Sequence, residues 1–276
     1  MILGVHYNIG KWLLLKQRWI EFGTERSPSK WSRKGFPEMF EGSPKLVTMR
    51  SPAYFPRTML DENNGYFNES AIGFKRWIDL KNINNKSLSK AYSSELERLK
   101  FEEISTLYSY SFLLSIFNSS LIRYELNSNR RSNIHIYPED WKSLKIPKIE
   151  NTNIEYIMEI EKKSNLMLEL NKNLQEIKQN FLNELHVEKL TKKLQNFEEL
   201  DFDEFVKEYT KAKKIKFADK LEERNFKNEW KALFENDKTL TCKLQNEITK
   251  TDKEIDKMVY KLYDLSEDEI MIVEGN

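Results

Sequence analysis

Residues 40–74, FEGSPKLVTMRSPAYFPRTMLDENNGYFNESAIGF, decide the fold of the first half of the chain. Prolines and glycines recur through this stretch, and both residue types interrupt helices. Residues 45–50 (KLVTMR) are rich in apolar and β-branched side chains, which favours a strand. The Asn64–Gly65 pair tolerates positive φ, so it predicts a hairpin of two short strands around a turn at residues 62–65.

Glycine and proline divide the whole chain near residue 150. All seven prolines and seven of the eight glycines precede that point, and Gly275 alone follows it. We therefore expect an α+β fold, in which a mixed strand and helix part is followed by an almost wholly helical part. The predicted domains are residues 1–150 and residues 151–276.

Helical periodicity is visible on both sides of that boundary. Apolar residues at mainly helical spacing predict a helix over residues 94–124. Beyond residue 153, a heptad stripe predicts a long helix through Ile160, Met167, Leu174 and Phe181. Such a stripe is either a spacer coiled coil that pairs with a partner or the core face of an ordinary helical bundle. Ser266 and Glu269 form a capping box that predicts a short helix at the end of the sequence.

The net charge of +1 conceals an asymmetry along the chain. Residues 1–150 hold 23 Lys and Arg against 16 Asp and Glu, a net +7, whereas residues 151–276 hold 22 against 28, a net −6. A basic half predicts an anionic partner. The high charge and the lack of an apolar run of roughly 18 residues predict a soluble protein without a membrane span. The single cysteine, Cys242, fits a reducing cytoplasm.

Basic and amide side chains in the loops of the first half are candidate DNA contacts. Lys and Arg neutralise phosphates, whereas Arg, Lys, Asn and Gln read base edges. The candidates are Arg33, Lys34, Lys45, Arg50, Arg57, Asn63, Asn64, Lys75, Arg76, Arg130, Arg131 and Asn133. The alternatives to DNA binding are that the cations are solvated charges in loops and that the two hairpin asparagines only form the turn. The strongest pair is Arg130 and Arg131, which have no evident core role in a polar loop before a predicted strand at residues 134–137.

Four segments, taken in order, resemble the TaqI-like C-terminal specificity domain of type IIG restriction–modification adenine methyltransferases. They are FEGSPKLVTMR (40–50), LLSIFNSSLIRYEL (113–126), IYPEDWKSLKIPKIE (136–150) and EIDKMVYKLYDLSEDEIMIVEG (254–275). The last segment is similar to the C-terminal signature of that family, although Asp264 stands where glycine is common. Each segment alone is a weak signal, and their order and spacing are what carry the resemblance.

The resemblance implies a DNA target-recognition module joined to helices, with double-stranded DNA and a methyltransferase domain or subunit as partners. The family's Asn-Pro-Pro-Tyr/Phe and Phe-x-Gly-x-Gly motifs are absent from this sequence. We therefore expect a non-catalytic chain without a cofactor of its own. Domains outside this chain would methylate adenine with S-adenosylmethionine. If DNA is cleaved, those domains would use Mg²⁺.

Three other interpretations stay open. The chain could be a half-sized type I restriction specificity subunit, forming a homodimer through its helices. It could be a helical interaction scaffold without a DNA role, which would leave the basic half unexplained. Asp140–Lys142 (DWK) matches part of a nuclease motif, but three-residue matches arise by chance. His6, His135 and His186 are far apart and show no metal-ligand spacing.

Overall fold

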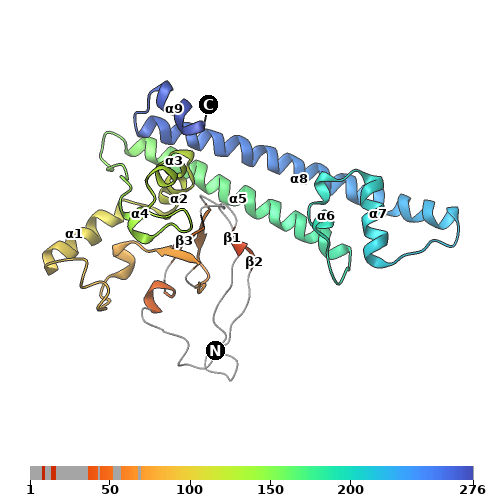
Figure 1. Cartoon of the computed structure of the whole chain (residues 1–276), viewed down its shortest axis with the longest axis horizontal. Helices are drawn as coiled ribbons and strands as arrows, with labels where there is room; N and C mark the ends of the chain where they lie inside the picture. Colours follow the sequence, from red (N-terminus) through yellow and green to blue (C-terminus); the bar gives the residue numbers. More distant parts are fainter. Residues whose placement is uncertain are drawn as a thin grey trace, which may run out of the picture. The chain divides into compact units, whose positions relative to one another are not determined.

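The computed structural model describes residues 8–9, 14–16, 37–42, 44–51, 57–67 and 70–275. The chain forms two compact units: unit 1 is Met1–Leu168 with Lys253–Asn276, and unit 2 is Glu169–Asp252. Two long helices, α5 (Ile154–Glu184) and α8 (Lys220–Leu262), contribute residues to both units (Figure 1). The α+β prediction is confirmed, because the described strands all precede residue 150 and the regular elements after it are helices. The compact units do not divide at residue 150, since the start of α5 and the end of α8 belong with the first half.

A three-stranded antiparallel sheet lies within unit 1. Its strands are β3 (Lys45–Met49), β4 (Thr58–Asp61) and β5 (Ala71–Phe74), in the order β4-β3-β5. Val47 in the central strand pairs with Met59 on one side and Gly73 on the other. Val47, Met59 and Ala71 form a small buried cluster. Two further strands, β1 (Asn8–Ile9) and β2 (Leu14–Lys16), pair with each other.

The predicted hairpin at residues 62–65 is wrong in its strand pairing, although the turn itself forms. The Asp61 carboxylate accepts the backbone N–H groups of Asn63 (2.9 Å) and Gly65 (2.8 Å), and Asn64 has φ 55. The chain then continues to the opposite edge of β3, so that β4 and β5 each pair with β3. Local turn chemistry reverses the chain, but the long-range partner decides which strands pair.

The predicted helix over residues 94–124 is divided into three in the structure. The helices are α1 (Glu95–Thr106), α2 (Tyr110–Asn118) and α3 (Ser120–Asn129). Ser109 and Ser119 interrupt the helical pattern, because each side-chain oxygen accepts the backbone N–H three residues later and caps a new helix. Apolar spacing alone did not distinguish one long helix from three short ones.

Aromatic rings and one amide join the sheet to the helices of unit 1. The rings of Phe74, Phe117 and Trp141 lie with their centroids 5.0 to 5.1 Å apart. The buried Asn118 side chain accepts the N–H of Thr58 and donates to its carbonyl, both at 2.9 Å. Trp141 belongs to α4 (Pro138–Lys142). The chain ends in α9 (Glu267–Glu274), where the predicted capping box of Ser266 and Glu269 is confirmed.

Unit 2 has a separate core made largely of aromatic rings. Helices α6 (Lys192–Gln195) and α7 (Phe202–Lys213) lie between the long helices in sequence. Phe181, Phe197, Phe205 and Phe234 are buried together in this core. Three of the four stripe residues are covered inside the chain, because Ile160 and Met167 are fully buried in unit 1 and Phe181 is fully buried in unit 2, whereas Leu174 is half-buried. The stripe is thus mainly the core face of a helical bundle, as the second interpretation of the heptad pattern predicted.

None of the helices in the described part of the chain combines the length and the apolar character that crossing a bilayer requires.

Candidate nucleic-acid interface

The sheet separates the candidate DNA contacts into two groups at opposite ends of β3. The start of β3 pairs with Asp61 and Phe74, so the neighbouring candidates are Lys45, Asn63, Asn64, Lys75 and Arg76. The other end leads to Arg50, and β4 enters beside it from Arg57, which precedes the Thr48–Thr58 pair. A strand rises about 3.3 Å per residue, so the two ends are roughly 15 Å apart.

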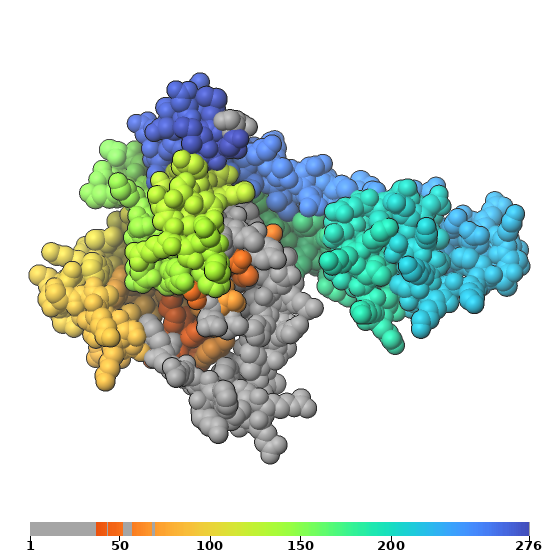
Figure 2. Space-filling view, in the orientation of Figure 1, coloured from red at the N-terminus to blue at the C-terminus, as the bar shows by residue number. Residues whose placement is uncertain are grey.

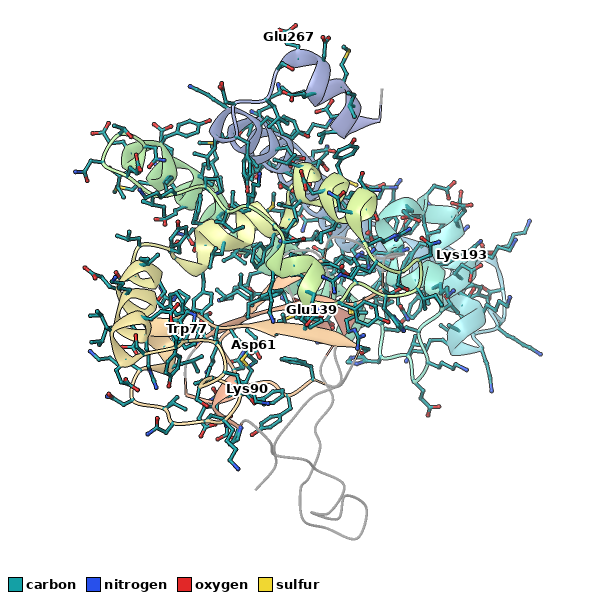
Figure 3. The ribbon with its side chains drawn as sticks, turned by 60° about the vertical axis from the view of Figure 1, so that its left-hand side comes forward. Asp61, Trp77, Lys90, Glu139, Lys193 and Glu267 are labelled. Carbon is teal, nitrogen blue, oxygen red and sulfur yellow. The ribbon has the colours of Figure 1, made fainter. Side chains whose placement is uncertain are left out.

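Two lysines at the first end are bound to groups of the protein itself, one of them fully buried and the other half-buried. The Lys45 side chain is fully buried, and its Nζ lies 2.6 Å from the Asp61 carboxylate and 2.9 Å from the Phe40 carbonyl oxygen. Burial lowers the pKa of Lys45, and Asp61 acts in the opposite direction. Lys75 donates to the carbonyl oxygens of Glu38 and Glu41, both at 2.6 Å. Figure 3 labels Asp61 beside the sheet. We leave both lysines out of the interface, because phosphates could not reach them without breaking these contacts.

Arg76 is clamped to the start of α2. Its guanidinium donates to both oxygens of Asp79, at 2.8 and 3.0 Å, and lies 4.6 Å from the centroid of the Tyr110 ring. The Tyr110 hydroxyl donates to Asp79 at 2.8 Å. Burial opposes ionisation of Asp79, but these hydrogen bonds and the charge of Arg76 hold its pKa below the usual value. Arg76 therefore has a packing role in this structure.

The two asparagines at the first end are exposed at the turn. The Asn64 side-chain oxygen accepts the backbone N–H of Gly42 at 3.1 Å, across to the segment before β3. Asn63 presents its side chain to solvent. Turn formation accounts for Asn64, which also adopts the left-handed conformation.

The second end brings together Arg50 and Ile136, which are 86 positions apart in the sequence. The Ile136 N–H donates to the Arg50 carbonyl oxygen at 2.9 Å. The Arg50 guanidinium also lies 5.1 Å from the centroid of the Tyr137 ring, within the range of a cation–π contact. The predicted strand at residues 134–137 does not form, because Pro138 begins α4 directly after this single attachment.

Arg131 lies on the attached segment and is largely open to solvent. Its side chain is 66% exposed, and its Nε lies 3.6 Å from the Asp140 carboxylate. Asp140 is itself buried and accepts the Tyr137 N–H at 2.7 Å, which caps α4. Arg130 ends α3 and is half-buried, whereas Asn133 is exposed. Most of the Arg131 guanidinium is therefore available to an outside partner.

We define the arginine cluster as Arg50, Arg57, Arg130 and Arg131, together with Asn133. All five lie in unit 1. Ile134 (72% exposed) and Tyr137 adjoin the cluster, although neither is among the candidates predicted from the sequence. The signal that could have found Tyr137 is its position directly after a basic loop and before a proline. The remaining two candidates, Arg33 and Lys34, lie outside the described residues.

The DWK triplet has a structural explanation in this fold. Asp140 caps α4 and Trp141 packs in the aromatic cluster, whereas Lys142 is exposed. Within the described ranges, no group of three or more His, Cys, Asp or Glu side chains is placed to hold a metal ion. Figure 3 labels Glu139, which marks α4.

Comparison with known proteins bears only on the helical region. Residues 154–259 match a family described as a domain of unknown function (DUF8810). The matched segment runs from the start of α5 nearly to the end of α8 and leaves out the arginine cluster. No curated protein and no solved structure matches the chain.

Proposed function

We propose that this chain is a sequence-specific DNA-reading module of a restriction–modification protein. The arginine cluster at the end of β3 would contact DNA. Adenine methylation, DNA cleavage or both would be carried out by domains outside the chain, with S-adenosylmethionine and Mg²⁺ bound there. The single observation that carries the proposal is the attachment of Ile136 and Tyr137 to Arg50, which ties the loop of Arg130, Arg131 and Asn133 to the end of β3.

The side chains of the cluster suit both parts of DNA recognition. Arginine pairs with phosphates as a cation and with guanine through two parallel hydrogen bonds, and asparagine pairs with adenine. The Ile136–Arg50 hydrogen bond holds the loop against the sheet, and binding loops are commonly positioned on such rigid supports.

The end of α8 supports the resemblance on which the restriction–modification assignment rests. Asp264 stands where the resembling signature has glycine, and its backbone has φ 55. Positive φ is the conformation that glycine adopts at least cost. The position therefore has the backbone geometry that the signature would require.

The proposal is tested with Arg130→Ala/Arg131→Ala in the full chain. We select a preferred duplex from a randomised pool and measure affinity by fluorescence anisotropy at several salt concentrations. Losing one good base contact costs about 1–3 kcal/mol, so we expect roughly 10-fold weaker binding to the selected duplex and weaker sequence preference. Salt-independent binding, or none to any duplex, would refute the proposal.

Two further variants sharpen the test. Lys90→Ala/Lys100→Ala removes the same charge from exposed positions elsewhere in unit 1 and should leave the preferred sequence unchanged. Arg131→Lys keeps the charge but removes the planar donor pair. If Arg131 reads a base, the lysine variant loses sequence preference while keeping most of its salt-dependent affinity.

A helical interaction scaffold is the second candidate, because all the regular elements described after residue 150 are helices. It predicts no DNA binding by the intact chain.

A half-sized type I specificity subunit instead predicts a homodimer, which light scattering would detect. Such pairing would need a face other than the buried heptad positions.

A further inference from the structure

Unit 2 carries a concentrated basic segment although its half of the sequence is acidic overall. The segment joins the end of α7 to the start of α8, and no acidic residue lies between Glu208 and Asp219. We define the lysine turn by its six exposed cations: Lys211, Lys213, Lys214, Lys216, Lys220 and Arg224. In Figure 2 the segment, coloured cyan to light blue, forms an outer face of unit 2.

The backbone of the lysine turn is held in place by contacts with the helices. The Ile215 N–H donates to the Thr210 carbonyl oxygen at 2.9 Å, which closes the end of α7. The Phe217 ring packs 5.3 Å from that of Phe226 on α8. Ile215 and Phe217 are half-buried, whereas Lys214 and Lys216, which alternate with them along the chain, are exposed.

The cations of the lysine turn form no ion pair with any described residue. Their acidic neighbours are engaged elsewhere: Asp219 accepts the N–H groups that open α8, Glu222 accepts the Ala218 N–H, and Glu223 pairs with Lys227. Four lysines elsewhere in unit 2 do form ion pairs: Lys178, Lys193, Lys227 and Lys231. Lys193, labelled in Figure 3, lies 3.4 Å from Glu208.

Helix stability accounts for only two of these cations. Lys211 and Lys213 lie in the last turn of α7, where the helix dipole favours positive charge. Lys214, however, has φ 59, a conformation that disfavours side chains with a Cβ. Lys220 opens α8, where the helix dipole disfavours a cation. Side chains that break local rules without a folding gain are expected at functional sites.

We propose that the lysine turn is a second DNA contact, one that binds the phosphate backbone independently of sequence. The inference rests on the proposed function, which makes duplex DNA the partner. Exposed lysines on a fixed turn are suited to phosphates as point charges, and they offer no planar donor pair for reading bases. A membrane surface is less well matched, because Leu221 is the one large apolar side chain exposed in the segment, whereas interfacial helices present a whole apolar face.

The test uses the full chain and the variant Lys213→Gln/Lys216→Gln. Each lost phosphate contact lowers the slope of log affinity against log salt by about 0.9, so we expect the slope to fall by about 2. Affinity should fall by the same factor on the selected duplex and on unrelated duplexes, on the order of 10-fold near physiological salt. The matched control, Lys172→Gln/Lys243→Gln, removes two exposed lysines of the same unit and should leave the slope unchanged.

Several outcomes would overturn the inference. Equal losses in the test and control variants would mean that overall charge, not the lysine turn, sets affinity. Loss of binding to vesicles containing phosphatidylserine, with DNA binding intact, would assign the turn to lipid. A full chain that binds no duplex removes both proposals together. If the lysine-turn variant weakens binding while Arg130→Ala/Arg131→Ala does not, the arginine cluster fails and the lysine turn stands.

Discussion

Arg76 shows at the residue scale why a basic side chain in a loop need not be a ligand contact. Arg76 was a candidate because it is a basic residue in the first half of the chain. In the structure it is bound to Asp79 and covered by the Tyr110 ring. Lys45 is a stronger case, because this residue of β3 forms a buried ion pair with Asp61. In both cases an acidic residue binds the cation, and it is local for Arg76 (Asp79) but 16 positions away for Lys45 (Asp61).

At this scale we predict that Asp79→Asn destabilises unit 1. A hydrogen bond to a charged group contributes about 1.5–3 kcal/mol, and the variant also leaves the Arg76 guanidinium without its counter-charge. The pKa of Asp79 lies below its ordinary value of 3.8, so its stabilisation is fully present above that pH and is lost as the pH falls through the folded-state pKa. Urea unfolding should show a loss of about 2 kcal/mol at pH 7, shrinking below pH 3.8.

The control for this prediction is Glu176→Gln, which neutralises an exposed carboxylate and should change stability little at either pH. A difference between Asp79→Asn and the native protein that stays constant from pH 7 to acid would contradict the assigned charge pairing.

At the scale of single elements, the ends of helices α7 and α8 have a common feature. Both α7 and α8 end on non-glycine residues in the left-handed conformation, at Lys214 (φ 59) and Asp264 (φ 55). In each case an N–H one residue further on bonds to a carbonyl oxygen five residues back. Glycine is the residue that this arrangement favours.

We therefore predict that Lys214→Gly and Asp264→Gly each stabilise the protein, by about 1 kcal/mol, because they relieve the left-handed backbone. Thermal and urea unfolding would measure the gain. Only Lys214→Gly should also weaken DNA binding, since it removes a cation of the lysine turn. A stability loss at either position would show that the side chain contributes contacts outweighing the backbone cost.

At the scale of the whole molecule, the two proposed DNA contacts lie in different compact units. The arginine cluster belongs to unit 1 and the lysine turn to unit 2. Neither group shares a partner side chain with the other in the described structure. Effects at separate sites without shared partners usually add.

This scale yields a prediction for the combined variant Arg130→Ala/Arg131→Ala/Lys213→Gln/Lys216→Gln. Its loss of binding free energy should equal the sum of the two separate losses within about 0.5 kcal/mol. Sequence preference should match that of the arginine variant alone. Anisotropy titrations on selected and unrelated duplexes would measure both quantities, and a markedly smaller combined loss would mean that the two clusters contact DNA as alternatives.

Sequence alone determined the features whose causes are local. Gly and Pro placement indicated the α+β organisation, the heptad stripe indicated α5, and Ser266 with Glu269 indicated α9. It also selected Arg50, Arg130 and Arg131, but it missed the lysine turn because a net charge averaged over 126 residues hides a local concentration. Tertiary structure decided the β4-β3-β5 order, the burial of Lys45, the covering of Arg76 by Tyr110 and the attachment of Ile136 to Arg50. Each of these depends on a partner distant in the sequence, and only the packed chain brings such partners within hydrogen-bonding range.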